Sequence, residues 1–580
     1  MKVLLLHPED RLPAPRPDRR WDLVVDMGRA PVATYERWSR QAGCRVISLY
    51  DFAQDFEDLH HVRELLQLGM GQWVDGFGID WWDVLSLMIE PDLRQLTLMG
   101  RLAQELRGGC ELYASRSTAL ATALQSLTGA KPVRMASGFR PGMRWARHYR
   151  SVFSQLDAGQ MSQAFQDKFD RQHSMRRRLA SSRRSSKEPV VLLPSAYINV
   201  SRTAASYAAL LPAEKFLLVY ARNSARLKSL PPNISAISLD PYFVTADRKE
   251  RAGLARSWEL LRSRLMAQAQ EYSAANATGV LDQVPALMRW GIAVRDAWNE
   301  VFASETIVGC LSADDSNPYT RLPLILAGNR EIPTLACHHG AMDSKMAVKL
   351  PHADTYVAKG EIELDFLVRR CRVAPEKVVL GGQGLPAAAD PEQPAARSTA
   401  PWLVFFTEPY QAAGWRAEEV YRELLPKLWA VAETCGLKLV FKIHPFESVK
   451  GHRRILRKYL PGQESGIEVI AGAPSPQLWR NTRIALTVQS TVALQCAALG
   501  IPVFLCAWLR DPTTGYVEQF SRFGIGQTVE SADKLSEIPG RLEIKGQTVP
   551  TRPALWKTMD PAKLRDLLRR TSSYSEALKA

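Results

Sequence analysis

The stretch KLVFKIHPFE, Lys438 to Glu447, joins an apolar run of strand length to an abrupt polar end. It predicts a buried strand that stops at His444 and Pro445, because proline cannot continue the strand and fixes the following turn. In open α/β sheets, ligands bind just beyond the carboxyl ends of the strands. The stretch therefore predicts a sheet that presents His444 at its ligand-binding edge.

Similar strand-length apolar runs alternate with amphipathic, helix-length stretches along almost the whole chain, which is the pattern of βα units and parallel sheets. The 580 residues are too many for one core. We expect an α/β protein with two Rossmann-like lobes that face each other across a cleft, and an additional N-terminal α/β domain. The expected parts are an N-terminal α/β domain at 1–130, a helical basic linker at 131–188, lobes at 189–390 and 400–530 joined by a Pro/Ala linker at 386–401, and C-terminal helices at 531–580.

The composition is that of a globular protein, with 46% hydrophobic and 23% charged residues. The eight cysteines form no CxxC motif, and several lie in apolar runs, so we expect reduced core residues in a cytoplasmic protein. The start, MKVLLLHPED, has too few consecutive apolar residues for a signal peptide and suits a first strand. No window offers the roughly 18 apolar residues of a spanning helix, so any membrane contact is expected to be peripheral.

The formal net charge of +15 indicates acidic partners. Its densest run, between Arg171 and Pro189, mixes Arg and Ser and is interpreted as a solvated hinge. Because no aromatic residues are interleaved for base stacking, nucleic acid is not expected as a partner. An anionic membrane surface at the inner face of the cell membrane remains a candidate partner.

Polar residues follow three strands of the 400–530 lobe. Glu408 follows WLVFF, Lys442 and His444 end the quoted strand, and Ser490 and Thr491 follow IALTVQ at the start of a helix. Hydroxyl groups and free backbone N–H groups at a helix N-terminus form an anion site, and a histidine beside them can donate to a phosphate. The alternatives are that Ser490 only caps its helix and that His444 is a turn or core residue.

The pair KIHPFE and TVQSTVALQCAALGIPV resembles the His-Pro and Ser/Thr signatures of bacterial GT-B glycosyltransferases that use CMP-activated acidic sugars. These are the sialyl-, polysialyl- and Kdo-transferases of surface polysaccharides such as capsule and lipopolysaccharide, and CDP-glycerol polymerases carry a related arrangement. The resemblance implies that 400–530 binds a nucleotide-sugar donor, through Glu408, Lys442, His444, Pro445, Ser490 and Thr491. It also implies that the final helices pack back on the first lobe, that 189–390 is the acceptor-side lobe, and that the acceptor is a glycan or glycolipid.

In the acceptor-side lobe, Asp314 and Asp315 follow an apolar strand, where an inverting transferase needs a carboxylate to accept a proton from the attacking hydroxyl. Either one could instead cap a turn. His338 and His339 also lie at a strand end, and HHG is similar to a His-Gly element of such transferases. We expect Asp314, Asp315 and His339 to be catalytic, and Ser195, Asn199 and His338 to lie on the acceptor side, although the sequence does not distinguish within the Asp or His pair.

Neither a metal site nor a cofactor is expected. The sequence contains no HExxH or CxxC motif, no P-loop lysine motif, and no GxGxxG after a strand. With the resemblance described above, the leading hypothesis is an inverting, metal-independent GT-B glycosyltransferase. A nucleotide-sugar 2-epimerase of the same shape and a catalytically silent scaffold for glycan assembly remain alternatives.

The N-terminal region is rich in tryptophan, and its role is not indicated by any motif. We expect Trp73, Trp81 and Trp82 to lie in a core or interface, since large aromatic side chains are costly to expose in numbers. Alternatively, they could form a platform that stacks on acceptor sugar rings.

Overall fold

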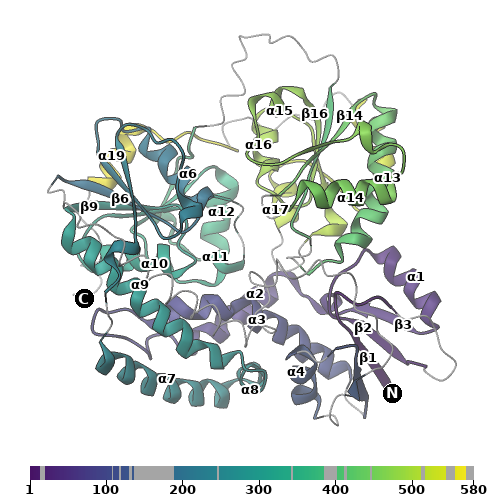
Figure 1. Ribbon diagram of the computed structural model, residues 1–580, viewed down its shortest axis with the longest axis horizontal. Coiled ribbons are helices and arrows are strands. Elements are labelled where there is room, and N and C mark those ends of the chain that lie inside the picture. Colours follow the sequence, from purple (N-terminus) through teal and green to yellow (C-terminus); the bar gives the residue numbers. More distant parts are fainter. Residues whose placement is uncertain are drawn as a thin grey trace. The chain divides into compact units, whose positions relative to one another are not determined.

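The computed structural model describes residues 1–12, 20–106, 109–116, 119–129, 134–135, 188–244, 247–340, 342, 344–384, 401–410, 414–444, 447–510, 516–543 and 555–569. The chain forms two compact units (Figure 1). Unit 1 contains residues 1–56, 98–153 and 385–556, and unit 2 contains 57–97, 154–384 and 557–580. The predicted basic linker lies outside the described residues except for 134–135 and 188, and so does the Pro/Ala linker except for Pro401.

Unit 1 contains a five-stranded parallel sheet with the order β3-β2-β1-β4-β5. Its first four strands are short and largely buried, and the C-terminal turns of helix α3 complete the core through Leu98, Met99 and Leu102. The strands are β1 (Lys2–Leu6), β2 (Leu23–Asp26), β3 (Arg45–Ser48), β4 (Glu111–Ala114) and β5 (Arg134–Met135), and the helices are α1 (Val32–Ala42), α3 (Trp81–Glu105, shared with unit 2) and α4 (Ala119–Thr128).

Unit 1 also contains a six-stranded parallel sheet with the order β15-β14-β13-β16-β17-β18. The strand predicted from KLVFKIHPFE is β14, whose Leu439, Val440 and Phe441 are buried. The strands are β13 (Trp402–Phe406), β14 (Lys438–Lys442), β15 (Glu468–Ile470), β16 (Thr482–Thr487), β17 (Val503–Cys506) and β18 (Gln527–Val529), and the helices are α13 (Ala417–Thr434), α14 (Val449–Tyr459), α15 (Pro476–Asn481), α16 (Val492–Ala498), α17 (Tyr516–Arg522) and α18 (Ile538–Glu543).

Unit 2 is built on a seven-stranded parallel sheet with the order β12-β11-β10-β9-β6-β7-β8. Helices cover both faces (Figure 1). The strands are β6 (Val190–Ser195), β7 (Phe216–Tyr220), β8 (Ile234–Ser238), β9 (Ile307–Ser312), β10 (Thr334–Cys337), β11 (Thr355–Ala358) and β12 (Val378–Leu380), and the helices are α2 (Asp55–Gln67), α6 (Ile198–Ala208), α7 (Arg248–Gln268), α8 (Gln270–Ala277), α9 (Val284–Ser304), α10 (Pro318–Gly328), α11 (Ser344–Val348), α12 (Glu361–Arg369) and α19 (Pro561–Arg569).

All three sheets begin with the same strand order. Numbered within each sheet, the strands run 3-2-1-4-5, so the sheet grows first to one side of its first strand and then to the other. This Rossmann-like reversal leaves a crevice at the carboxyl ends of the first and fourth strands. The predicted α/β class, with Rossmann-like parallel sheets and an additional N-terminal one, is confirmed. No helix within the described ranges has the length and apolar character needed to cross a membrane.

The tryptophans form part of the core of unit 2. Trp73, Trp81 and Trp82 are 1%, 0% and 0% exposed. Trp73 and Trp82 pack on Trp258 at ring distances of 5.3 and 5.8 Å. The predicted core position is therefore confirmed, and the alternative of a sugar-stacking platform is wrong because none of these rings is accessible. Residues 57–97, which carry them, group with unit 2 rather than with the rest of 1–130.

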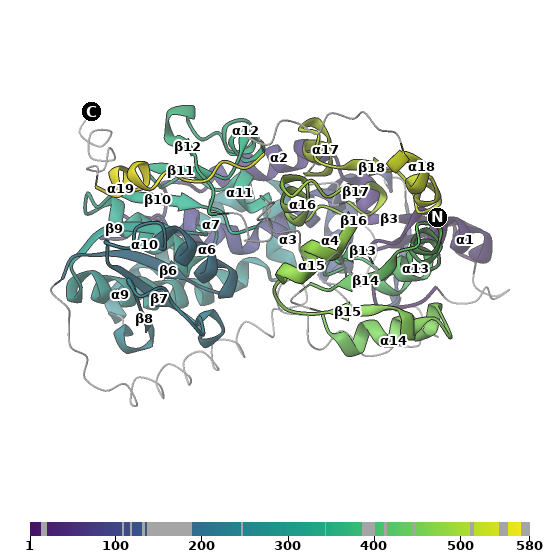
Figure 2. The same ribbon diagram turned by 90° about the horizontal axis from the view of Figure 1, so that it is seen from above.

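The C-terminal helices pack against different units. Helix α19 packs against β9 and β10 (Figure 2), and Leu564 and Leu568 join the core of unit 2. Gly309 permits this approach, because a Cβ there would lie 3.2 Å from the carbonyl oxygen of Leu568. The expectation that the final helices pack on the first lobe is thus confirmed for α19. It is wrong for α18, which packs against α13 in unit 1.

A buried arginine joins the two sheets of unit 1. Arg416, just before α13, donates through Nε and Nη2 to both carboxylate oxygens of Asp26, at 2.7 Å each. Its remaining donors bind the carbonyl oxygens of His7, Pro8 and Asp10 at 2.5–3.0 Å. These carbonyls follow β1, and Asp26 ends β2, so the guanidinium occupies the carboxyl edge of the N-terminal sheet.

We predict that Arg416→Ala lowers the free energy of unfolding by about 3–5 kcal/mol, because it leaves the Asp26 carboxylate buried without its partner. Urea unfolding measures this change. Arg37→Ala is the matched control, since the pair Arg37–Glu419 joins α1 to α13 but leaves 40% of the Arg37 side chain exposed. Its loss should cost about 1 kcal/mol or less. Equal losses in the two variants would contradict the role assigned to Arg416.

Candidate functional site

The crevice of the six-stranded sheet lies where β13 and β16 end. Thr407 and Glu408 follow β13, and Gln489 follows β16. The backbone N–H of Gln489 donates to Oε1 of Glu408 at 3.4 Å, which joins the two sides of the crevice. Burial raises the pKa of Glu408 to about 7. This carboxyl therefore changes protonation near neutral pH, at the position where a doubly wound sheet binds its ligand.

His444 follows β14 in a turn that is held together by hydrogen bonds. Its backbone N–H donates to Oγ1 of Thr407 at 3.0 Å and to Oε2 of Glu447 at 3.3 Å, and its carbonyl oxygen accepts from the Glu447 N–H at 2.9 Å. The Thr407 hydroxyl also donates to Glu447. Burial and the nearby Lys442 lower the pKa of the His444 imidazole to about 4. His444 is therefore neutral at pH 7, with one ring N–H as a donor; Pro445 lies outside the described residues.

The other predicted donor-side residues differ in their surroundings. Lys442 is buried, and its ammonium donates to the carbonyl oxygen of Ile443 at 3.1 Å. Ser490 and Thr491 precede α16 and are partly exposed. The Ser490 hydroxyl accepts weakly from the Val492 N–H at 3.4 Å, whereas the N-cap residue of α16 is Thr491, whose side chain forms no capping bond. Roles for Lys442, Ser490 and Thr491 in donor binding stay predictions.

Sequence reasoning missed the residues that support this crevice. The Tyr421 hydroxyl lies 2.8 Å from Nε2 of the buried His452 and 3.4 Å from Oε1 of Glu447. Burial raises the pKa of Glu447 to about 7 and lowers that of His452 to about 4. Glu447 closes the quoted stretch KIHPFE, so its position was a usable signal. Tyr421 and His452 lie on the packed faces of α13 and α14, where the sequence gives no such signal.

The raised pKa of Glu447 predicts a pH dependence of stability. The carboxyl has a pKa of 4.5 in the unfolded chain and about 7 in the fold. Its contribution is therefore fully present below pH 4.5 and is lost as the pH rises through 7. Glu447→Gln, which keeps an acceptor for Thr407, should flatten the fall in unfolding free energy between these pH values by about 1–3 kcal/mol.

Urea titrations at several pH values test this prediction. Glu433→Gln, an exposed site near the end of α13, is the matched control. An unchanged pH profile in Glu447→Gln would show that the Glu447 carboxyl is not protonated in the folded crevice.

The crevice of unit 2 lies where β6 and β9 end, and it brings together Asp314, Tyr197 and His339. Asp314 is 1% exposed and accepts from the Ser316 N–H at 3.0 Å and the Asn317 amide at 2.7 Å. The Tyr197 hydroxyl reaches it at 3.4 Å and lies 3.0 Å from Nε2 of His339. Tyr197 thus bridges a carboxylate and an imidazole. Sequence reasoning missed it, although it follows β6 in the stretch PSAYINVS.

Asp314 and His339 differ in charge at neutral pH. Burial alone would raise the pKa of Asp314, but the neighbouring His339 and His338 and the Ser316 hydroxyl lower it, so the carboxylate is ionised. Burial, with His338 next, lowers the pKa of His339 to about 4. The imidazole is therefore neutral at pH 7, which is the form that can accept a proton.

Asp315 has the contacts of a structural carboxylate. It is buried, forms an ion pair with the buried Lys349, and accepts from the Tyr356 hydroxyl at 3.2 Å. Its carbonyl oxygen accepts from Arg321, a fully buried guanidinium that also binds Asp83 on α3. Asp314, rather than Asp315, makes the turn before Ser316. The catalytic roles of both aspartates stay predictions.

The remaining predicted residues of unit 2 are not equally accessible. His338 is 5% exposed, and its Nδ1 lies 3.1 Å from the Gly340 carbonyl oxygen, whereas His339 is partly exposed. Ser195 is 0% exposed and lies 2.6 Å from the Ser201 hydroxyl, which argues against direct contact with an acceptor. Asn199 lies partly exposed in the first turn of α6, and its role stays a prediction.

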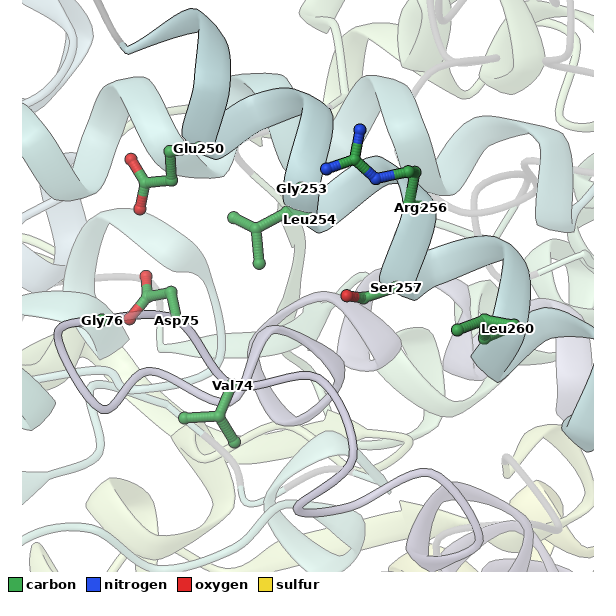
Figure 3. A pocket seen from close by; sticks show the side chains of 9 residues that line it. All are labelled: Val74, Asp75, Gly76, Glu250, Gly253, Leu254, Arg256, Ser257 and Leu260. Atoms are coloured by element: carbon green, nitrogen blue, oxygen red, sulfur yellow. The ribbon is translucent and has the colours of Figure 1, made fainter.

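Two further observations concern metal ligands and the position of a surface hollow. Within the described ranges, no group of three or more His, Cys, Asp or Glu side chains is arranged as a set of metal ligands. A hollow of about 560 Å³ in unit 2 lies between the loop at Val74–Gly76 and helix α7 (Figure 3). It contains none of the predicted site residues.

Comparison with known proteins gives similarity of structure alone. No family model and no curated protein sequence matches the chain. Among solved structures, the UDP-GlcNAc 2-epimerase of Neisseria meningitidis bound to UDP-GlcNAc is 12% identical with a TM-score of 0.43, over 66% of this chain and 99% of that chain. The UDP-GlcNAc 2-epimerase of Methanocaldococcus jannaschii is 11% identical with a TM-score of 0.38, over 68% and 99% of the two chains. A glycosyltransferase from Rickettsia africae is 12% identical with a TM-score of 0.37, over 68% and 97%.

Proposed function

We propose that the chain is a nucleotide-sugar enzyme of the GT-B type that transfers a sugar from a nucleotide donor to a glycan or glycolipid acceptor. The observation that carries this proposal is the β13/β16 crevice, where Glu408 meets Gln489 at the switch point of a Rossmann-like sheet. Doubly wound sheets bind nucleotides at this position. Neutral His444 at the end of the adjacent β14 supplies a donor suited to a phosphate oxygen.

We assign the β6/β9 crevice to the acceptor side. His339 is the preferred base there, because it is neutral and partly exposed, whereas Asp314 already accepts from Ser316 and Asn317. Tyr197 would hold the imidazole beside the Asp314 carboxylate, whose charge stabilises the imidazolium that forms when His339 accepts a proton. Such a base performs the inverting, metal-independent transfer expected from the sequence.

The finer part of the proposal is the donor. The His-Pro and Ser/Thr signatures at His444 and Ser490 support a CMP-activated acidic sugar, and the net charge of +15 suits acidic substrates. Screening CMP, CDP, UDP and GDP for thermal stabilisation tests this directly. A nucleotide at about 100 times its dissociation constant adds roughly 2.7 kcal/mol of stability, so CMP should raise the melting temperature most. Stabilisation by UDP alone would contradict the CMP assignment and leave the nucleotide-sugar proposal intact.

His444→Ala should lower turnover far more than stability, because a hydrogen bond to the leaving phosphate strengthens as charge develops on it. Loss of one such donor typically costs about 2.7–4 kcal/mol of barrier, or roughly a hundredfold to a thousandfold in rate. Ser490→Ala should weaken the same contact. Transfer rate and melting temperature are measured on each variant.

His452→Ala is the matched control for this experiment. His452 is buried against Tyr421 behind the crevice, so its loss should lower the melting temperature while the folded fraction keeps near-normal specific activity. A His444→Ala variant with normal transfer rates would overturn the phosphate role.

The epimerase alternative is distinguished by the acceptor requirement. A 2-epimerase converts its nucleotide-sugar without a second substrate, whereas a transferase releases nucleotide only slowly until an acceptor is added. Donor consumption that yields an epimeric nucleotide-sugar without an acceptor would decide for the epimerase. Binding of donor without either reaction would support the scaffold.

A further inference from the structure

Helix α14, which packs against α13 in unit 1 (Figure 1), carries basic residues along one side. Its sequence, VKGHRRILRKY, contains lysine and arginine residues but no carboxylate. Basic residues recur there at the spacing i, i+3, i+4 and i+7, so they share one face of the helix. All four are exposed, namely Lys450, Arg453, Arg454 and Arg457. We call these four residues the α14 stripe.

The opposite side of α14 belongs to the core of unit 1. Leu456 is buried in that core, and Val449, Ile455 and Tyr459 pack against it. The helix is therefore held in place by its apolar side, and the stripe faces the solvent. At about 1.5 Å of rise per residue, the stripe is a row of cations roughly 10 Å long.

The carboxylates of α13 do not cancel the charge of the stripe. Three of them lie beside cations that are not part of the stripe: Glu418 beside Lys458 and Arg11, and Glu419 and Glu423 beside Arg37. The fourth, Glu433, lies near the other end of α13, roughly 22 Å along the helix from Glu418. The contact between Lys458 and Glu418 shows that α14 meets the first turn of α13 rather than this distant end.

The other elements around α14 contribute few free carboxylates. Glu447 precedes the helix, and burial raises its pKa to about 7. Glu464 is partly buried in the short 3-10 helix Glu464–Gly466, which packs against α14. In β15, which also packs against α14, Glu468 pairs with Lys438. The cations of the stripe therefore outnumber the carboxylates near them.

The positive charge of the stripe is costly for the fold. In the part of the chain that the structure describes, Lys450, Arg453 and Arg457 form no ion pair. Like charges three and four residues apart on a helix repel each other, and Lys450 also lies in the first turn, where the helix dipole disfavours a cation. Such an arrangement lowers stability unless an anion is bound. Departures from local stability of this kind are typical of functional sites.

We propose that the α14 stripe binds an acidic polysaccharide chain. Arginine donates paired hydrogen bonds to carboxylate and phosphate groups, and basic runs such as RRILRK form patches that bind linear polyanions. The stripe begins six residues after His444, so it lies close to the donor crevice in the sequence and in unit 1. The inference rests on the proposed function in one respect, since it makes the acceptor glycan an acidic polymer.

Two other polyanionic partners fit the stripe less well. A membrane surface would need apolar side chains on the exposed side of the helix, whereas those of α14 pack on the core. A single-stranded nucleic acid would need a free aromatic ring for stacking. The partly buried Tyr459 donates to Glu418 at 2.9 Å, and its ring centroid lies 5.1 Å from the Lys458 ammonium. The acid groups of a polysaccharide need neither feature.

Binding of fluorescently labelled polygalacturonate, a linear polymer of a carboxylated sugar, to the full-length protein tests the proposal. We expect binding of this polymer, no binding of neutral dextran, and loss of binding at high salt. The double variant Arg453→Gln/Arg457→Gln should weaken binding about tenfold. Its melting temperature without polymer should stay the same or rise, because two exposed and mutually repelling charges are removed.

Arg480→Gln/Arg483→Gln is the matched control, because it removes two exposed arginines of the same unit where α15 meets β16. It should bind like the wild type. Equal weakening in the two double variants, or no binding by the wild type, would overturn the proposal. Displacement of the labelled polymer by duplex DNA or phosphatidylglycerol vesicles at a lower concentration of charged groups than by unlabelled polygalacturonate would also overturn it. No nucleotide donor is present, so failure to bind leaves the proposed transferase untouched, and the nucleotide screen tests the transferase separately.

Discussion

The reversal of strand order within each parallel sheet fixes where polar groups meet in this chain. All three sheets grow to one side of the first strand and then to the other, so the first and fourth strands end at a crevice. The three crevices hold different chemistry. In the N-terminal sheet, the Arg416 guanidinium binds at the carboxyl ends of β1 and β2. In the other two sheets, the crevice joins Glu408 to Gln489 and Tyr197 to Asp314. The same topology therefore provides one structural contact between sheets and two candidate sites.

Buried arginines connect segments that lie far apart in the sequence. Arg416 binds Asp26, Arg321 binds Asp83, and Arg295 binds Asp75. Removing a charge from water is costly, and a planar guanidinium offsets this cost by bidentate contacts and by donating to backbone carbonyls. Arg321 uses both means, since it binds Asp83 and the carbonyl oxygen of Asp315. It thereby fixes the backbone beside Asp314 without entering the crevice.

The fold was largely predictable from the sequence, and the site only in part. Buried parallel strands need nearly continuous apolar runs, so WLVFF and KLVFK predicted β13 and β14, and the residues after them were found by the rule for strand ends. Tyr197, Glu447 and Arg416 were missed. Their roles depend on partners brought close by tertiary packing, as Arg416 and Asp26 lie 390 residues apart. No period or motif marks such pairs in the sequence. The predicted boundary at residue 130 also kept residues 57–97 with the N-terminal domain, whereas they group with unit 2.

The titratable side chains in and behind the crevice of the six-stranded sheet have shifted pKa values with a common cause. Burial raises the pKa values of Glu408 and Glu447 to about 7 and lowers those of His444 and His452 to about 4. In each case the surroundings favour the neutral form. With its carboxyls protonated, the crevice suits an anionic ligand better than it does with both carboxylates ionised. Because coupling between two bound species is reciprocal, an anion bound beside Glu408 would raise the pKa of that carboxyl further. Binding of a nucleotide phosphate above pH 7 would then take up a proton, and the affinity would fall as the pH rises.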